Sequence, residues 1–190
     1  VDTVQWVSAA VSAGFKGVLT EFRYREGTRP DYELMRGFYD ACVPKDLKCG
    51  LSFYLDYVLS RISTNPETYV TELLTELCRL YDGFFEIRLD LGVSRLDADT
   101  LSAAIKAVQP DCLVSLKNEA GDIFSSDYMK TNDSDTWAVR QKNDGGYVWS
   151  QTEMVVSVAD GTKIKSAAKL KDIYLDTIGR NCSMLLSVPI

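Results

Sequence analysis

Three charged residues alternate with apolar ones in the stretch FFEIRLDLG, residues 84–92. This period of two predicts a β-strand in which Glu86, Arg88 and Asp90 share one face. Gly92 ends the run and predicts a loop directly after the strand. A carboxylate at the end of a buried strand can react with a substrate, whereas an arginine beside it can neutralise it. Two interpretations therefore stay open: a structural ion cluster, and a site that uses these charged side chains.

The chain contains no histidine among its 190 residues. This excludes every mechanism that depends on an imidazole, including Ser-His-Asp catalysis, Cys-His catalysis and metal binding by histidine. The five cysteines are scattered and form no CxxC pair, so we expect buried thiols rather than a zinc site or a dense disulfide framework. Any catalysis must therefore use carboxylates, tyrosines, lysines or a supplied cofactor.

Length and composition predict a single globular domain over residues 1–190, with 46% hydrophobic and 25% charged residues. The net charge of −6 disfavours a nucleic-acid partner, which would need a basic face, and suits a neutral small molecule or a sugar. No apolar run reaches the length of a membrane span. Glycosylation sequons at Asn132 and Asn181 permit a secreted or lumenal location without establishing it.

Helical and strand patterns alternate along most of the chain. Apolar residues at helical spacing predict helices over 3–12, 31–42, 65–80, 97–108 and 166–178. Short apolar runs predict strands over 16–20, 49–57, 84–92, 112–116, 154–158 and 183–189. The segment 118–150 is rich in Asn, Asp, Ser and Gly, and predicts mostly loop with one short strand at 137–141. Such repeats indicate a parallel sheet covered by helices.

Two arrangements of a parallel sheet fit this pattern: an open, doubly wound sheet and a closed barrel. Both bind ligands at the carboxyl ends of their strands. The charged residues Asp56 and Asp90, at predicted strand ends, favour the barrel. No glycine-rich phosphate loop follows a predicted strand, which counts against a nucleotide-binding sheet. We therefore predict an α/β fold of the (β/α)8 TIM-barrel type.

Several segments resemble, in the same order, those of one enzyme family. They are QWVSAAVSAGFKGVLTEF (5–22), GLSFYLDY (50–57), ELCRLYDGFFEIRLDLG (76–92), QPDCLVS (109–115), GDIFSSD (121–127) and SAAKLKDIYLDTIGRNCSMLLSVP (166–189). Together they are similar to the α-L-fucosidases of glycoside hydrolase family 29 and cover nearly the whole chain. The resemblance implies a retaining glycosidase that acts on terminal α-L-fucosyl residues of glycans, with no metal or organic cofactor.

The resemblance also implies the reacting residues. Asp90 falls on the family's nucleophilic aspartate, and Asp127 falls on the glutamate that is the general acid in many members. Glu119 and Asp122 are alternative acids in the same loop. A retaining glycosidase needs two carboxyl groups about 5–5.5 Å apart, one ionised for attack and one protonated for the leaving oxygen.

A second group of residues is expected to contact the sugar. Two of them stand in place of the family's pair of histidines and can donate hydrogen bonds to hydroxyl groups. Arg23 and Tyr24 are these two residues, and Arg88 replaces a tryptophan before the nucleophile. Three aromatic residues could form a stacking wall for a sugar ring or cover the barrel rim: Trp137, Tyr147 and Trp149.

Departures from the family pattern keep a second hypothesis open. The two histidines are absent, the acid is one methylene shorter, and the family's first barrel strand has no counterpart upstream of Val1. We therefore expect a partial or shortened barrel, which a missing chain segment or a partner protein would complete. The alternative function is a catalytically inactive fucosidase-like protein that binds carbohydrate or serves as a structural subunit.

Overall fold

The computed structural model describes residues 2–25, 29–62, 65–93, 96–117, 121–127, 139–141, 145–149 and 151–188. Within these ranges, residues 24–25, 29, 139–141 and 147–149 are described by their backbone alone. The chain falls into two compact units, Val1–Ser115 and Leu116–Ile190.

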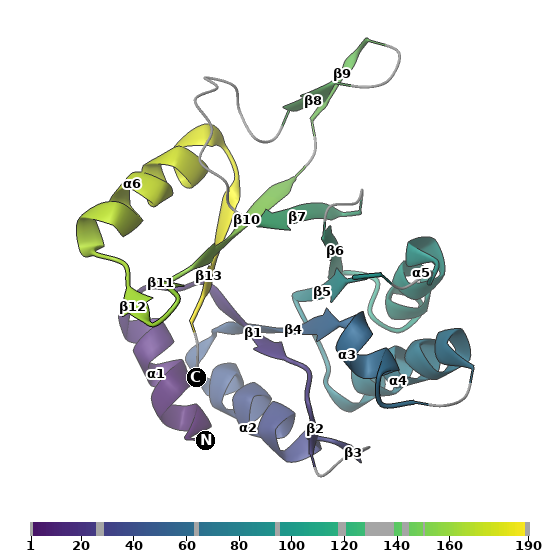
Figure 1. Ribbon diagram of the computed structural model, residues 1–190. Helices are drawn as coiled ribbons and strands as arrows, with labels where there is room; N and C mark the ends of the chain where they lie inside the picture. The colour runs from purple at the N-terminus through teal and green to yellow at the C-terminus, as the bar shows by residue number, and fades with distance from the viewer. Residues whose placement is uncertain are drawn as a thin grey trace. The chain divides into compact units, whose positions relative to one another are not determined.

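The first unit alternates helices and strands (Figure 1). Its elements are α1 (Thr3–Ser12), β1 (Gly17–Glu21), β2 (Tyr24–Arg25), β3 (Arg29–Pro30), α2 (Tyr32–Cys42), the 3-10 helix η1 (Val43–Lys45), β4 (Lys48–Tyr54), α3 (Leu55–Leu59), α4 (Pro66–Leu80), β5 (Glu86–Asp90), α5 (Ala98–Val108) and β6 (Leu113–Lys117), which continues into the second unit. Strand β4 pairs in parallel with both β1 and β5, whereas β2 and β3 form a short antiparallel pair.

Aspartate side chains begin three helices of this unit. Asp2, Asp31 and Asp97 each accept a hydrogen bond from the backbone N–H three residues further on, at 2.9, 3.1 and 2.9 Å. Such caps satisfy N–H groups that have no partner inside the helix. Asn65, which precedes α4, makes no side-chain cap bond. Proline at the start of α4 fixes the helical backbone there instead.

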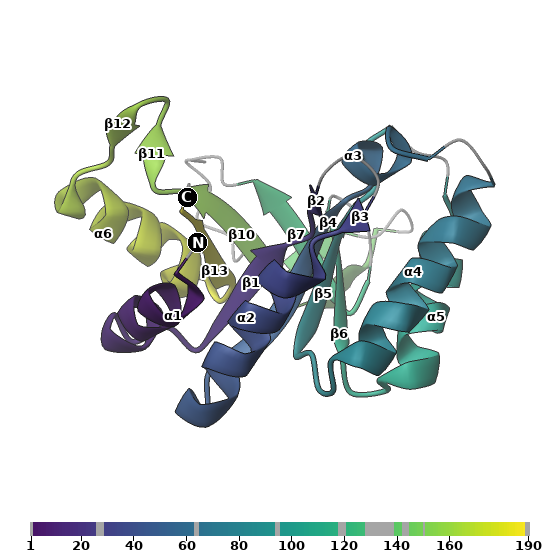
Figure 2. The ribbon, with the colours of Figure 1, turned by 90° about the horizontal axis from the view of Figure 1, so that it is seen from below.

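The helices of the first unit pack in two pairs, α1 against α2 and α4 against α5 (Figures 1 and 2). Gly37 allows the first pair to approach closely, because a Cβ atom at this position would lie 3.0 Å from Thr3 Oγ1. On α4 the buried stripe is Val70, Leu73, Leu74, Leu77 and Cys78. Tyr69 is half-buried and Leu80 is exposed, so neither belongs to this stripe.

All five cysteines are buried and free, as predicted. Burial raises the pKa of Cys78 and of Cys182 to about 11, and that of Cys112 to about 12. These three thiols therefore remain protonated near neutral pH and are poor nucleophiles.

The second unit also contains parallel strands. Its elements after β6 are β7 (Ile123–Asp127), β8 (Val139–Gln141), β9 (Tyr147–Trp149), β10 (Thr152–Ser157), β11 (Ala159–Asp160), β12 (Lys163–Ile164), α6 (Ala167–Thr177), the 3-10 helix η2 (Ile178–Arg180) and β13 (Ser183–Ser187). Strand β10 pairs in parallel with β7 and β13, and β8–β9 and β11–β12 are antiparallel pairs. The residue that ends η2 in a left-handed conformation is Asn181, with φ +63°.

Two further predictions of local structure need correction. The strand predicted over 49–57 ends at Tyr54, because the chain turns directly into α3, whose Leu55 and Val58 are buried. Asp56 therefore lies on a helix rather than on a strand. In the segment predicted as mostly loop, the structure contains β7 and β9 as well as the expected short strand, which is β8.

Strand order distinguishes the two sheet arrangements. Parallel strands are neighbours in chain order within each unit: β1-β4-β5-β6 in the first and β6-β7-β10-β13 in the second. A doubly wound sheet reverses its strand order at a switch point, whereas a (β/α) barrel does not. The seven-stranded sheet is that of a partial (β/α) barrel, as the sequence predicts.

Gln109 joins three segments of the first unit through a buried side chain. Its Nε2 donates to the carbonyl oxygens of Cys78 and Tyr81, at 2.7 and 2.5 Å. Its Oε1 accepts from the N–H of Phe84 at 2.9 Å. These bonds fix the end of α5 to the end of α4 and to the turn that leads into β5. The glutamine of the QPD segment thus has a structural role.

Replacing Gln109 with alanine should lower the free energy of unfolding by about 3 kcal/mol, because one buried N–H and two carbonyl groups lose their partners. Urea unfolding followed by circular dichroism measures this loss. Gln151→Ala is the matched control: Gln151 is exposed and donates one long bond of 3.4 Å to Ser183 Oγ. Its loss should stay below about 0.5 kcal/mol. Equal losses in both variants would contradict the role of Gln109.

Candidate functional site

Strand β5 carries its charged residues on one face, as the alternation predicts. Glu86 and Arg88 are 3% and 2% exposed, and Asp90 is half-buried at the carboxyl end of the strand. Ile87 and Leu89, on the opposite face, are fully buried. Both faces of β5 are thus covered, as in a barrel strand. Of the three charged residues, Asp90 is the one that reaches the edge where barrel enzymes place catalytic groups.

Glu86 is buried in the first unit and forms a hydrogen bond there. Its Oε1 accepts a hydrogen bond of 2.7 Å from Ser115 Oγ on β6. The second unit repeats this arrangement, where Ser125 Oγ on β7 donates to Glu153 Oε1 on β10 at 3.1 Å. Buried carboxylates need such partners, because burial without them is costly. Glu86 thus has a structural hydrogen bond inside the first unit, and Asp90, at the end of the strand, remains the candidate for chemistry.

The turn after β5 orients Asp90. Asp90 Oδ1 accepts a hydrogen bond of 3.2 Å from the N–H of Gly92, two residues further on. This is the Asx-turn geometry, in which an aspartate side chain binds its own backbone. Gly92 has φ +57°, a left-handed conformation that glycine adopts without strain. The glycine that ends the charged stretch is therefore part of the arrangement that holds the carboxylate.

Two residues near Asp90 were missed as site candidates by the sequence analysis. Tyr54, the last residue of β4, is opposite Asp90 in the strand register and is 41% exposed. Asp56, two residues later, binds the N–H of Val93. The sequence could have indicated both residues by their position, because they come directly after the buried residues of β4.

Arg23 and Tyr24 follow β1 at the same carboxyl edge of the first unit. The Arg23 side chain is 54% exposed, and its Nη2 lies 2.9 Å from Glu21 Oε2. Tyr24 lies in β2, and its side chain is outside what the structure describes. The exposed guanidinium of Arg23 is chemically able to contact a sugar hydroxyl.

The structure describes Asp127 within the second unit, at the end of β7. Its Oδ2 lies 3.2 Å from Lys117 Nζ, and its side chain is 65% exposed. Asp122 is exposed just before β7. Glu119 and Trp137 lie outside the described residues, and Tyr147 and Trp149 are described only as backbone of β9.

Metal binding and membrane crossing concern the described ranges alone. Within them, no group of three or more Cys, Asp or Glu side chains could hold a metal ion. Nor does any helix placed by the structure have the length and apolar character needed to cross a membrane.

Sequence comparison relates the chain to the α-L-fucosidases. No family model matches it. Alpha-L-fucosidase 1 of Arabidopsis thaliana is 27% identical over 240 aligned residues, which take in 100% of this chain and 47% of that protein. The chain thus spans about half the length of this curated relative.

Solved structures agree with that relation. A candidate α-L-fucosidase from Bacteroides thetaiotaomicron matches with a TM-score of 0.76 and 20% identity, over 98% of this chain and 52% of that one. The α-L-fucosidase of Lactobacillus casei, in complex with its α-L-fucose product, matches with a TM-score of 0.73 and 13% identity, over 100% of this chain and 72% of that one. At these identities the likeness shows the fold alone. The predicted resemblance to family 29 α-L-fucosidases is confirmed, and the partial barrel is their fold.

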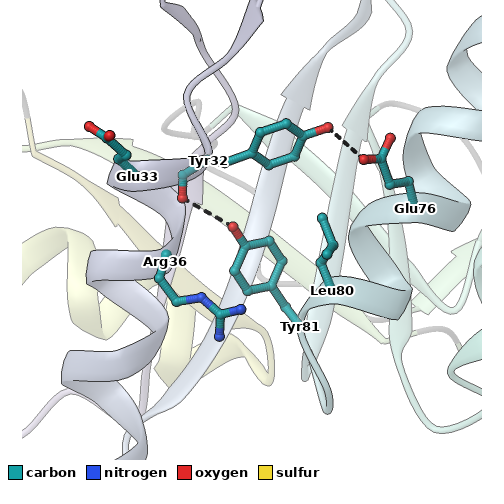
Figure 3. A pocket seen from close by; sticks show the side chains of 6 residues that line it. All are labelled: Tyr32, Glu33, Arg36, Glu76, Leu80 and Tyr81. Carbon is teal, nitrogen blue, oxygen red and sulfur yellow. Dashed lines mark hydrogen bonds between the residues drawn. The ribbon is translucent and has the colours of Figure 1, made fainter.

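A hollow of about 430 Å³ lies between α2 and α4 of the first unit (Figure 3). Its lining consists of Tyr32, Glu33, Arg36, Glu76, Leu80 and Tyr81. Tyr32 donates to Glu76 Oε1 at 3.0 Å, and Tyr81 donates to the carbonyl oxygen of Tyr32 at 3.1 Å. The Arg36 guanidinium lies 5.0 Å from the centroid of the Tyr81 ring. None of these six residues is a predicted site residue, and their contacts tie two helices together.

Burial and the carboxylate of Glu76 raise the pKa of Tyr32 to about 12. Because this folded-state value lies above the ordinary one, the stability that the Tyr32 hydroxyl contributes is present below about pH 10 and lost as pH rises toward about 12. The difference in unfolding free energy between wild type and Tyr32→Phe should therefore shrink over this interval. Urea unfolding at a series of pH values measures it, and a constant or growing difference would contradict the assignment.

Proposed function

We propose that this chain is the catalytic barrel region of a retaining α-L-fucosidase-like glycoside hydrolase, which acts on terminal α-L-fucosyl residues of glycans. The observation that carries the proposal is the position of Asp90 at the carboxyl end of β5, in a chain that resembles α-L-fucosidases over its whole length. The comparisons favour this function over an inactive carbohydrate-binding subunit.

In the first chemical step, the carboxylate of Asp90 attacks C1 of the fucosyl residue. A bond forms between an Asp90 oxygen and C1, and the bond between C1 and the glycosidic oxygen breaks. The electron pair of the broken bond stays on the leaving oxygen, which takes a proton from the general acid. The product is a fucosyl ester of Asp90.

In the second step, water replaces Asp90 at C1. The residue that gave up its proton now acts as a base and removes a proton from the attacking water. The C1–Asp90 bond breaks, and its electron pair returns to the carboxylate. Two inversions at C1 give fucose with retained configuration. The N–H of Gly92 keeps the nucleophile oriented through both steps.

We assign the proton donor to Asp127, with Glu119 and Asp122 as alternatives. Asp127 forms an ion pair with Lys117, which requires an ionised carboxylate. A general acid must instead carry a proton before the first step, so this ion pair has to break. The Asp127 side chain is 65% exposed and that of Lys117 is 23% exposed, and ion pairs that solvent reaches contribute at most about 1 kcal/mol. Asp127 can therefore leave Lys117 at little cost when substrate binds.

The remaining predicted residues would bind the sugar rather than react with it. Arg23 is exposed and able to donate to hydroxyl groups. Arg88, at 2% exposure, suits a supporting role beneath Asp90 better than a direct sugar contact. Tyr24, Trp137, Tyr147 and Trp149 are retained as candidate sugar contacts on the strength of the family resemblance.

The protein should release nitrophenol from a nitrophenyl α-L-fucoside. Asp90→Asn should lower kcat by about 10³-fold or more, because an amide is a poor nucleophile, and should leave the thermal unfolding curve nearly unchanged. Asp99→Asn, on the exposed first turn of α5, is the control and should keep kcat within about 2-fold. Lack of turnover by the wild-type chain, or an Asp90→Asn variant with more than a tenth of its activity, would contradict the proposal.

Loss of the general acid should matter only for leaving groups that need a proton. Asp127→Asn should lower kcat/KM by about 10²-fold or more for an alkyl or sugar α-L-fucoside, and far less for the nitrophenyl fucoside, whose leaving group departs as a stable anion. Asp122→Asn, measured on the same two substrates, tests the alternative acid. If Asp127→Asn affects both substrates equally, Asp127 is not the proton donor.

A further inference from the structure

Helix α3 holds Asp56 in a fixed position beside the end of β5. The helix follows β4 without a linker, and its Leu55 and Val58 are fully buried. The carbonyl oxygen of Asp56 also accepts a hydrogen bond of 3.0 Å from the N–H of Ser60. The backbone of Asp56 is therefore anchored to the core of the first unit, while the residue itself is exposed.

The carboxylate of Asp56 lies against the turn that follows β5. Both of its oxygens are 3.2 Å from the backbone nitrogen of Val93. A Cβ atom placed on Gly92 would lie 2.0 Å from Asp56 Oδ2, well inside van der Waals contact. The positive φ of position 92 favours glycine, and a side chain there would also force the Asp56 carboxylate to move away from the turn.

Two carboxylates thus hold adjacent amides of one turn. Asp90 Oδ1 accepts from the N–H of Gly92, and Asp56 accepts from the N–H of Val93. Asp90 ends β5, and Asp56 lies on α3, which directly follows the neighbouring strand β4. The ends of the two strands are aligned, because Tyr54 at the end of β4 is in register with Asp90. Movement of the turn away from Asp56 would also move the amide that orients Asp90.

We infer that Asp56 is a positioning residue for Asp90. It holds the Gly92–Val93 turn so that the N–H of Gly92 keeps the Asp90 carboxylate aimed for attack. The inference rests on the proposed function, since it assigns a role with respect to the nucleophile. A misplacement of a reacting group by about 1 Å can lower the rate by about 10²-fold. The loss should appear in kcat rather than in KM, because the orientation of Asp90 matters in the transition state.

The test compares two substitutions at Asp56. Asp56→Ala removes the acceptor for Val93, and should lower kcat on a nitrophenyl α-L-fucoside by about 10- to 100-fold with KM within about 3-fold. Asp56→Asn keeps one acceptor oxygen at the same distance from the backbone, and should keep kcat within about 3-fold. Amide hydrogen exchange of Val93 should be faster in the alanine variant and unchanged in the asparagine variant.

Asp97→Ala is the matched control. Asp97 also accepts a backbone hydrogen bond, from Thr100 at 2.9 Å, but it caps α5 and is not bonded to the Gly92–Val93 turn. Its loss should lower stability, as for other helix caps, and leave kcat unchanged. If Asp56→Ala fails to fold, Asp56→Glu serves instead: the longer side chain keeps the charge but cannot occupy the same space beside Gly92, and should also lower kcat.

The outcomes separate the inference from the proposed function. An active wild-type chain whose Asp56→Ala variant keeps its kcat would overturn the positioning role, as would an equal kcat loss in Asp97→Ala or in Asp56→Asn. A wild-type chain without fucosidase activity would overturn the proposed function itself. A kcat loss in Asp56→Ala that Asp56→Asn does not show, together with the matching change in Val93 exchange, supports the inference.

Discussion

A charged side chain can be buried in a barrel only where another group forms a hydrogen bond or ion pair with it. The positions of the charged residues on β5 follow from that constraint. Glu86 is buried with the hydroxyl of Ser115 as its partner, and Glu153 is buried with Ser125 in the same way. Satisfying these groups inside the protein avoids the cost of leaving a buried charge without a hydrogen bond. Asp90 lies four residues after Glu86 on the same face, at the end of the strand, and accepts a hydrogen bond from the backbone N–H of Gly92. One strand thus provides both buried charged residues and a carboxylate at its end, which the proposed chemistry uses.

The turn after β5 links the fold to the proposed chemistry. Its glycine has a left-handed backbone, and the Asp56 carboxylate lies directly against it. The positions of β4, α3 and β5 are set by burial of their apolar residues. The turn, held by Asp56, in turn orients Asp90 through the N–H of Gly92. A hydrolase of this kind depends on such fixed orientation, because rate enhancement requires the reacting groups to be held before the transition state is reached.

Much of this fold could be predicted because local patterns and burial agree. The alternation in 84–92 correctly predicted which residues of β5 share a face, and apolar residues at helical spacing correctly predicted α2 and α5. The pattern failed where tertiary packing decides the structure. The run 49–57 is apolar enough for a strand throughout, yet burial of Leu55 and Val58 favours a helix after Tyr54. Asn65 has the right residue type for a cap, but its side chain makes no cap bond.

The site was less predictable than the fold. Asp90 could be found from the sequence because a charge at the end of an apolar strand is a recognisable pattern, and its role came from the family resemblance. The contact between Asp56 and Gly92 joins residues 36 positions apart, and no local pattern reports it. The hydroxyl partners of Glu86 and Glu153 were equally hidden, because serine is common in loops and strands alike.

The central claim is that Asp90 forms a covalent bond to the sugar. A 2-deoxy-2-fluoro-fucosyl fluoride tests it directly, because the fluorine at C2 destabilises the cationic transition state of both steps while the fluoride leaving group keeps the first step accessible. Mass spectrometry of the digested protein should then find the fluorofucosyl mass on the peptide that contains Asp90, and none after Asp90→Asn. A label on another carboxylate, or steady turnover of the reagent with no labelled peptide, would contradict the account.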